Sequence, residues 1–185
     1  MPAVPGPLRR AQRVVIAFDE AVDQRVDRLR GHPALDRLMY GASELGDWSL
    51  LWHLLGAGQA LLPGRDPMSA VRVSTILGAE SLLVNGAVKS LFRRHRPVWE
   101  EDRPRPHRVR TPSSSSFPSG HASAGFTAAL VLGQGDPWWP IYYGAAAVVA
   151  SSRVYVKMHH ASDVLAGVAL GVAMGGLARR VWRRT

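Results

Sequence analysis

The sequence of 185 residues contains no cysteine, which excludes several classes of protein at once. Without thiols the chain forms no disulfide framework, no zinc–thiolate site and no cysteine-held iron–sulfur cluster. Lysine is also scarce, because only Lys89 and Lys157 contribute to the 23 basic residues. The formal net charge is nevertheless +9. Such a charge indicates a polyanionic partner such as nucleic acid, the basic loops of a membrane protein, or a site for a small phosphate.

Long uninterrupted hydrophobic runs are lacking too, although shorter ones are frequent. With 46% apolar and 20% charged residues, the chain is neither collagenous nor mainly disordered, and its length suits one domain. Most apolar runs fall below the ~20 residues of a spanning helix, but flanking residues can extend them. Several such runs leave too little polar surface for a soluble protein. The runs are Trp48–Gly64, Val73–Val88, Thr111–Gly135, Pro137–Ser152 and Val164–Ala178.

The runs and the turn residues between them predict an all-α, polytopic membrane helix bundle of about five to six transmembrane helices. The domain is expected over residues 35–182, multi-pass in the cell (plasma) membrane. Small residues inside the last run are those that closely packed membrane helices use. They are Gly167, Gly171, Gly175 and Gly176. The expected helices cover residues 35–62, 69–92, 120–134, 138–156 and 161–182.

The N-terminal region divides into two parts. Residues 1–13 are rich in Pro and Arg and are predicted to be disordered, and they lack the apolar segment of a secretory signal. Residues 14–30 have apolar positions at helical spacing, which predicts an amphipathic helix. This helix either packs on its own domain or lies on the membrane surface, and it is a poor candidate for a sixth span.

Three polar clusters stand at the ends of the expected helices. They are Lys89 to Pro97, Phe117 to His121 and Ser152 to Asp163. A chain that alternates across a membrane places these helix ends on the same side. Segments that are distant in sequence therefore meet by topology alone.

The clusters contain the groups that bind a tetrahedral oxyanion. Lys89, Arg96 and Arg153 supply charged N–H donors, and arginine forks suit phosphate oxygens. Ser119 and Gly120 open a helix whose free backbone N–H groups favour an anion. Taken singly, the basic residues are equally well ordinary charges beside a membrane.

The same clusters contain an acid–base set. His121 and His159 offer a nucleophile and an acid in the neutral range. Asp163 follows His159 by four residues, so it lies on the same helical face and can accept from one ring nitrogen. The alternative is a structural pair for His159 and Asp163, and a helix cap for His121. No group of residues has metal-ligand spacing, so the pattern requires neither a metal nor a cofactor.

This arrangement resembles the type 2 phosphatidic acid phosphatase (PAP2) superfamily, in its membrane-bound bacterial form. The family signatures Lys-x6-Arg-Pro, Pro-Ser-Gly-His and Ser-Arg-x5-His-x3-Asp match in order. In this chain they run from Lys89 to Pro97, from Pro118 to His121 and from Ser152 to Asp163. Family members usually have six transmembrane helices, whereas this sequence offers five good ones.

The resemblance implies an integral membrane phosphatase that hydrolyses a lipid-linked phosphate or diphosphate without a metal. His159 would attack phosphorus and become a phosphohistidine, and Asp163 would orient it. His121 would protonate the leaving oxygen and then activate water. The phosphate-binding residues would be Lys89, Arg96, Arg153, Ser119 and Gly120.

Other functions and several substrates stay open at this level. The residues also suit a vanadate-dependent haloperoxidase, although those proteins are far longer, or a non-enzymatic anion-binding membrane protein. The expected partners are membrane lipids and a lipid-phosphate substrate, not nucleic acid. The substrate is a phosphatidate, a phosphatidylglycerol phosphate, a polyprenyl diphosphate or a polyprenyl phosphosugar. A basic loop, Val98–Ser116, is expected either to select the head group or to be solvated.

The distribution of charge bears on orientation. Most Lys and Arg residues fall on the side of the three clusters, so the positive-inside rule favours a cytoplasm-facing site. That side suits a substrate made on the inner leaflet, such as a polyprenyl phosphoribose phosphate. Labelling of cysteines introduced at Ser115 and Thr185 would report the orientation. Inside an expected span, Glu80 is predicted to pair with Arg72 or to make a polar contact between helices.

Overall fold

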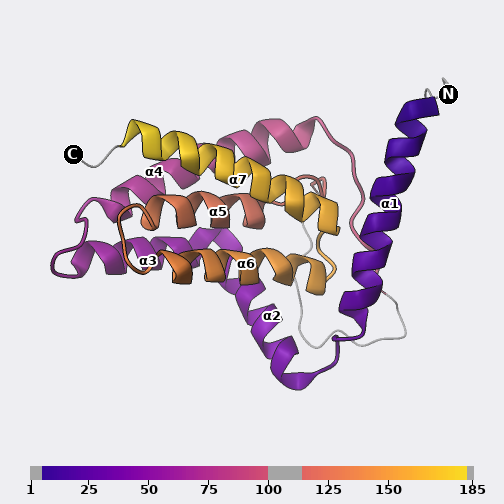
Figure 1. Cartoon of the computed structure of the whole chain (residues 1–185), viewed down its shortest axis with the longest axis horizontal. Helices are drawn as coiled ribbons and strands as arrows, with labels where there is room; N and C mark the ends of the chain where they lie inside the picture. Colours follow the sequence, from indigo (N-terminus) through magenta and orange to yellow (C-terminus); the bar gives the residue numbers. More distant parts are fainter. Residues whose placement is uncertain (1–5, 100–113, 183–185) are drawn as a thin grey trace.

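The computed structural model describes residues 6–99 and 114–182, and within these ranges every regular element is helical. The predicted all-α class is therefore confirmed for the described residues. The described residues form seven α-helices (Figure 1). A short 3-10 helix, η1, lies between α2 and α3, and a π-helical segment, η2, continues α4. Their bounds are α1 Gly6–Asp27, α2 Pro33–Leu45, η1 Asp47–Ser49, α3 Leu50–Leu61, α4 Ser69–Ser81, η2 Leu82–Val88, α5 Gly120–Leu132, α6 Trp139–Tyr155 and α7 Ala161–Val181.

Helix α5 is the centre of the bundle. It contacts α3, α4, α6 and α7, and most of its residues are buried. Ala, Gly, Ser and Thr make up most of its sequence, and these small side chains let neighbouring helices approach closely. The Ser119 side chain caps its first turn by accepting a hydrogen bond from the Ala122 N–H. The helix thus has a fixed start at the place where the second polar cluster lies.

Helix α7 packs on α5 through a stripe of glycines, as the sequence predicts. A Cβ atom on Gly167 would lie 2.4 Å from the Ser119 carbonyl oxygen, and one on Gly171 equally close to that of Ser123. Only glycine permits such an approach of two helix backbones. Gly176 is different, because a Cβ there would meet nothing within 4 Å. The stripe sets the distance between the α5 N-terminus and the α7 N-terminus, where polar clusters two and three meet.

The predicted helix over residues 35–62 is wrong, because the chain breaks between α2 and α3. Trp48 and Ser49 adopt left-handed φ angles of 55° and 59° at the break. The physical reason is tertiary. Gly46 lies so close to His121 that a Cβ atom would stand 2.6 Å from the ring, and the break turns Asp47 toward the same ring. The other four predicted helices agree with α4–η2, α5, α6 and α7.

Helix α1 begins at Gly6, inside the stretch 1–13 that the sequence predicts to be disordered. It crosses the end of the bundle at a steep inclination to α5, α6 and α7 (Figure 1). Its C-terminal half packs on its own domain, which is one of the two predicted alternatives, because Val22 and Val26 contact a core cluster of α5–α7 residues. Its N-terminal half exposes Val14 and Phe18.

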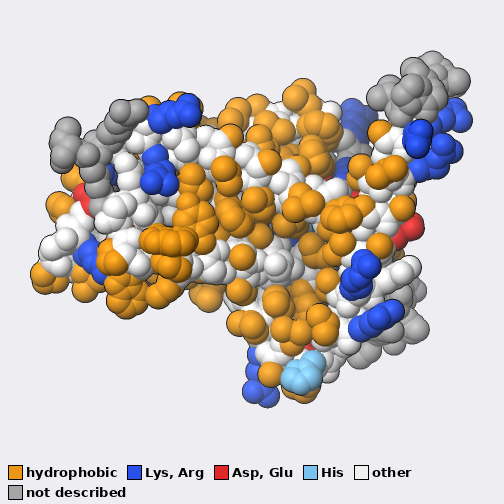
Figure 2. All heavy atoms as spheres, in the orientation of Figure 1, with side chains coloured by type: hydrophobic (Ala, Val, Ile, Leu, Met, Phe, Trp, Pro, Cys, Tyr) orange, Lys and Arg blue, Asp and Glu red, His pale blue; other side chains and the backbone are white. Residues whose placement is uncertain are grey.

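The bundle presents broad hydrophobic surface, as Figure 2 shows on one face. Among the described residues, two helices are long and apolar enough to cross a membrane, Ser69–Val88 and Ala161–Val181. The shorter α5 is apolar as well. Exposed Trp138 and Trp139 lie near the α6 N-terminus, where the sequence suggests interface anchors. The count of five to six spans stays a prediction.

Candidate active site

The site is built where four helix ends meet: the end of η2, the start of α5, the end of α6 and the start of α7 (Figure 1). The predicted convergence of the three clusters is therefore observed. Helix α6 ends in a turn in which Lys157 takes a left-handed φ of 53°. The Arg153 carbonyl accepts hydrogen bonds from the Met158 and His159 N–H groups, at 2.9 and 3.0 Å. This turn holds His159 inward, with 3% of its surface exposed.

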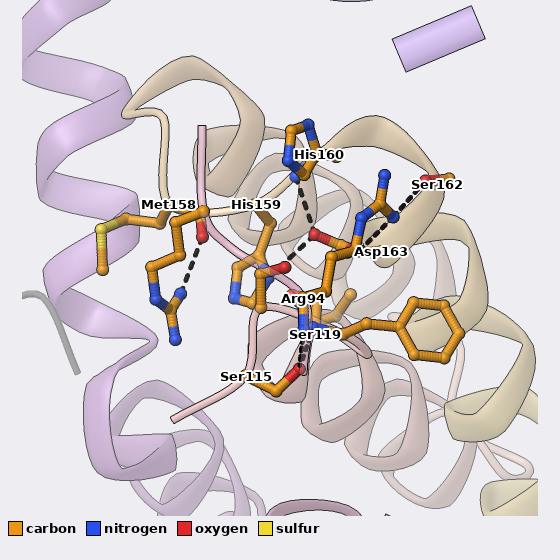
Figure 3. A network of polar contacts seen from close by, with 12 residues as sticks. Arg94, Ser115, Ser119, Met158, His159, His160, Ser162 and Asp163 are labelled. Carbon is orange, nitrogen blue, oxygen red and sulfur yellow. Dashed lines mark hydrogen bonds and ion pairs between the residues drawn. The ribbon is translucent and has the colours of Figure 1, made fainter. Parts of the chain in front are cut away.

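Asp163 faces His159 from the first turn of α7. Its Oδ2 lies 3.7 Å from His159 Nδ1 and accepts a hydrogen bond from the His160 N–H at 2.9 Å (Figure 3). The two residues thus face each other, although His159 lies in the turn before α7 and not on a helical face shared with Asp163. Among the described residues, His159 Nδ1 has no hydrogen-bond partner. The nearby carboxylate favours the tautomer with the proton on Nδ1, which leaves Nε2 with a free lone pair.

The charge state of His159 follows from its surroundings. Burial lowers the pKa of the His159 imidazole to about 3, against a smaller opposing effect of Asp163. The nearby positive charges of Arg153, Arg96 and Lys89 lower the pKa further. The ring is therefore neutral at physiological pH and has the lone pair that a nucleophile requires.

Three basic side chains surround this pair. Arg96 donates from Nη1 to the Met158 carbonyl at 2.7 Å, and Arg153 donates to the Ser43 hydroxyl. Arg153 is 3% exposed, and its Nε has no hydrogen-bond partner within the described ranges. Burial of a guanidinium costs free energy unless an anion compensates it. The arrangement can therefore accept an oxyanion between Lys89, Arg96 and Arg153.

The pKa of Lys89 depends on its burial and on the neighbouring charged side chains. Burial lowers the pKa of the Lys89 amine to about 8, and the adjacent positive charges of Arg96 and Arg153 act in the same direction. The negative charges of Glu80 and Asp163 oppose this shift. An anion in the site would bring the amine back to its charged form, because an opposite charge nearby favours ionisation.

The α5 N-terminus contributes the second cluster. Ser119 and Gly120 are buried at the helix start, and the Ser119 N–H donates to the Asp163 carbonyl at 3.0 Å. A Cβ on Gly120 would stand 2.7 Å from Asn85 Oδ1 of η2, so a larger residue would require the Asn85 side chain to move. His121 follows in the first turn of the same helix. A helix start so close to three cations adds backbone donors for an anion.

His121 has a partner that the sequence did not indicate. Its Nε2 donates to Asp47 Oδ1 at 2.9 Å, and the Asp47 side chain is half exposed. Asp47 belongs to the break between α2 and α3, which the helical pattern conceals. The only signal in the sequence is the Gly46-Asp47 pair, which is typical of a turn.

A second group of residues was also missed. Arg94, inside the first motif but outside its signature positions, donates from Nη1 to Asp163 Oδ1 at 2.6 Å (Figure 3). Its other nitrogen pairs with Asp19 of α1 at 2.5 Å. The amphipathic helix therefore belongs to the site.

Glu80 does not pair with Arg72, since Arg72 forms an ion pair with Asp66 at 2.9 Å. That part of the prediction is wrong. Glu80 is 1% exposed and lies beside Ser123 of α5, as the alternative of a polar contact between helices requires. It also approaches Lys89, whose charge it stabilises.

A cavity of about 240 Å³ opens beside His159. His159 and Arg94 lie on one side, and α1 supplies the other side with Asp19, Glu20 and Asp23. Its polar wall therefore places carboxylates of α1 opposite nitrogen-bearing side chains. The loop residues expected to select a head group, Arg103, Arg105, His107, Arg108 and Arg110, lie outside the described residues.

Comparison with known proteins decides the family. The sequence model of the PAP2 superfamily matches residues 69–185, which is more than half of the chain. The chain belongs to the PAP2 superfamily. The match contains all three polar clusters, so the predicted resemblance is confirmed.

The relatives of this PAP2 protein are phosphatases. It is 34% identical over 175 residues to decaprenylphosphoryl-5-phosphoribose phosphatase of Mycobacterium tuberculosis, and the match covers 93% of both chains. The crystal structure of a transmembrane PAP2 type phosphatidylglycerolphosphate phosphatase from Bacillus subtilis superimposes with a TM-score of 0.68 and 28% identity, over 91% of this chain and 86% of that one. The crystal structure of Aquifex aeolicus LpxE gives 0.69 and 25%, over 86% and 93%.

These likenesses confirm the predicted class of enzyme. The PAP2 protein is a phosphoric ester hydrolase, a membrane phosphatase of lipid-linked phosphates.

Proposed function

We propose that this PAP2 protein removes the terminal phosphate from a lipid-linked sugar phosphate through a phosphohistidine at His159. The observation that carries the mechanism is the buried, neutral His159 with Asp163 Oδ2 on its Nδ1 side, at 3.7 Å. An imidazole held in this way presents Nε2 to phosphorus. The protein supplies the whole reaction from its own side chains.

The first step forms the phosphoenzyme. The Nε2 lone pair of His159 forms a bond to phosphorus, and the bond from phosphorus to the ester oxygen breaks. His121 gives a proton to that oxygen, so the lipid leaves as an alcohol. Asp163 compensates the positive charge that develops on the His159 ring.

The second step regenerates the enzyme. A water molecule gives a proton to His121 and attacks phosphorus, and the phosphorus–nitrogen bond breaks. Its electron pair returns to Nε2 of His159, and inorganic phosphate leaves. Lys89, Arg96 and Arg153 stabilise the oxygens in both steps, where one donor contributes about 3 kcal/mol to the transition state.

The cavity beside His159 supports a sugar as the adjoining group. Glu20 and Asp23 line it with carboxylate oxygens, which accept hydrogen bonds from hydroxyl groups. A second phosphate would meet like charge there. The curated relative that is matched over 93% of its length has a phosphoribose substrate in its name, which supports the same choice. Phosphatidylglycerol phosphate is the second candidate, favoured by the structural likeness to the B. subtilis enzyme.

The proposed location is a multi-pass position in the cell membrane. Two observations support it: the two helices that are long and apolar enough to span, and the likeness of the whole fold to the transmembrane phosphatase of B. subtilis.

The experiment compares purified wild type with His159→Ala on decaprenylphosphoryl-5-phosphoribose and on phosphatidylglycerol phosphate. Wild type should release phosphate from the phosphosugar lipid with the higher kcat/KM, and acid-labile labelled phosphate should be trapped on the protein. His159→Ala should lose both signals, by about 1,000-fold or more in kcat.

The matched control is His53→Ala, because His53 belongs to α3 and bonds Ser74. This variant should retain the wild-type rate and the trapped label. Equal phosphate release by wild type and His159→Ala would contradict the mechanism. A preference of wild type for phosphatidylglycerol phosphate would contradict the choice of substrate alone.

A further inference from the structure

Asp19 is a buried carboxylate on the outer helix of the molecule. It is 6% exposed, whereas its neighbour Phe18 is 42% exposed and Glu20 is exposed as well. Its carboxylate accepts hydrogen bonds from the Ser162 N–H and hydroxyl, both at 2.8 Å. The Arg94 guanidinium forms the remaining bond, at 2.5 Å. Because this carboxylate is buried and fully hydrogen-bonded, its role is to interact with neighbouring residues and not with solvent.

Arg94 joins this carboxylate to the catalytic one. Its Nη1 donates to Asp163 Oδ1 at 2.6 Å and to the Ser162 hydroxyl at 2.7 Å (Figure 3). Its Nη2 donates to Asp19. The planar guanidinium thus lies between two carboxylates, and its orientation is fixed by both.

The consequence is a fixed orientation of Asp163. Arg94 holds its Oδ1 and the His160 N–H holds its Oδ2, so the carboxylate cannot rotate away from His159 Nδ1. Charge matters as well. If Arg94 stood alone beside Asp163, it would neutralise the carboxylate that compensates the developing imidazolium. The charge of Asp19 offsets this effect.

We propose that Asp19 is a positioning residue that acts through Arg94 to hold Asp163 against the nucleophile, so that α1 is a working part of the active site. The inference rests on the proposed role of Asp163. It assigns a function to a helix that precedes the family signatures by some 70 residues of chain.

The test is a double-mutant cycle with Asp19→Asn, Arg94→Ala and the double variant, measured on the lipid phosphate that wild type hydrolyses fastest. Asp19→Asn should lower kcat about 10-fold and Arg94→Ala about 100-fold, with KM within about 2-fold, because neither residue contacts the phosphate. The losses in the double variant should be clearly less than additive, since Asp19 acts on Asp163 through Arg94. Arg93→Ala, which removes the exposed neighbouring arginine, should match wild type.

Chemical rescue separates positioning from folding. Guanidinium ion at tens of millimolar should restore about 10-fold of the lost kcat in Arg94→Ala, because the ion occupies the place between two carboxylates. It should not restore the double variant, in which one of its two anchors is gone. Destabilised protein would not respond to the ion in this selective way.

Three results would overturn the inference: a wild-type kcat for Asp19→Asn, additive losses in the double variant, or rescue that does not depend on Asp19. If Arg94→Ala does not fold, Arg94→Lys takes its place in the cycle, with the same non-additivity expected. A wild type that releases no phosphate from any lipid of the panel would contradict the proposed function instead.

Discussion

Lys89 offers a test of the phosphate site by pH alone. Burial and the charges of Arg96 and Arg153 lower the pKa of its amine to about 8 in the free enzyme. Only the protonated amine binds phosphate as a cation. Because kcat/KM reports the ionisation of the free enzyme, it should decline as the pH rises above about 8.

The size of the decline follows from this value. With a pKa of about 8, roughly nine tenths of the amine is charged at pH 7 and roughly one tenth at pH 9. We therefore expect kcat/KM to fall about 10-fold between these pH values. Bound phosphate stabilises the charged amine, so the corresponding limb of kcat should lie at higher pH.

The assay is phosphate release by the detergent-solubilised enzyme between about pH 6 and 10. Lys89→Arg keeps a positive charge over the whole range, since guanidinium does not lose its proton there. Its profile should lack the alkaline limb, even though its absolute rate is lower. Lys157→Arg is the matched control and should keep the wild-type limb, because Lys157 pairs with Asp23 of α1 at 3.4 Å.

The reasoning would be refuted if Lys89→Arg declined above pH 8 just as wild type does. It would also be refuted if Lys157→Arg removed the limb, because the titrating group would then lie outside the phosphate site.

Two further substitutions test other contacts of the structure. Asp47→Asn should lower kcat about 10-fold on an alkyl phosphate and little on an aryl phosphate, because an aryl leaving group needs no proton from His121. An equal loss on both substrates would contradict the proposed role of His121 as the acid. Gly167→Ala forces a Cβ toward the Ser119 carbonyl, now 2.4 Å away, and should lower the free energy of unfolding by about 1–3 kcal/mol. Gly176→Ala, in open space, should stay within about 0.5 kcal/mol in the same thermal unfolding measurement, and equal effects would contradict the packing argument.

Helix positions were largely readable from the sequence. The predicted helix 161–182 differs from α7 by a single residue, because Ala161 follows a polar capping segment and apolar periodicity continues to the terminal arginines. Lys89, Arg96, Arg153, His159 and Asp163 gather as predicted, since successive helices of the bundle run in alternating directions and bring their ends together. Local patterning and topology suffice for both.

The break after α2 could not be read in this way. Residues 35–62 contain no proline, and apart from Gly46-Asp47 nothing in their sequence indicates a break with two left-handed residues. The break exists because Gly46 packs against His121, a residue of α5, and that contact is between segments far apart in the chain. The same break places Asp47 beside His121. The sequence pattern that failed to predict the break therefore also failed to predict this partner of His121.

The role of α1 shows the same division. The sequence by itself determined that residues 14–30 form an amphipathic helix, because periodicity is a local property of the chain. The tertiary structure alone decided that Asp19 meets Arg94 and Ser162, which lie 75 and 143 positions further along. Such pairings depend on which helix ends pack together and at what inclination. The free-energy cost of burying a charge is compensated only where the tertiary structure places an opposite charge beside it.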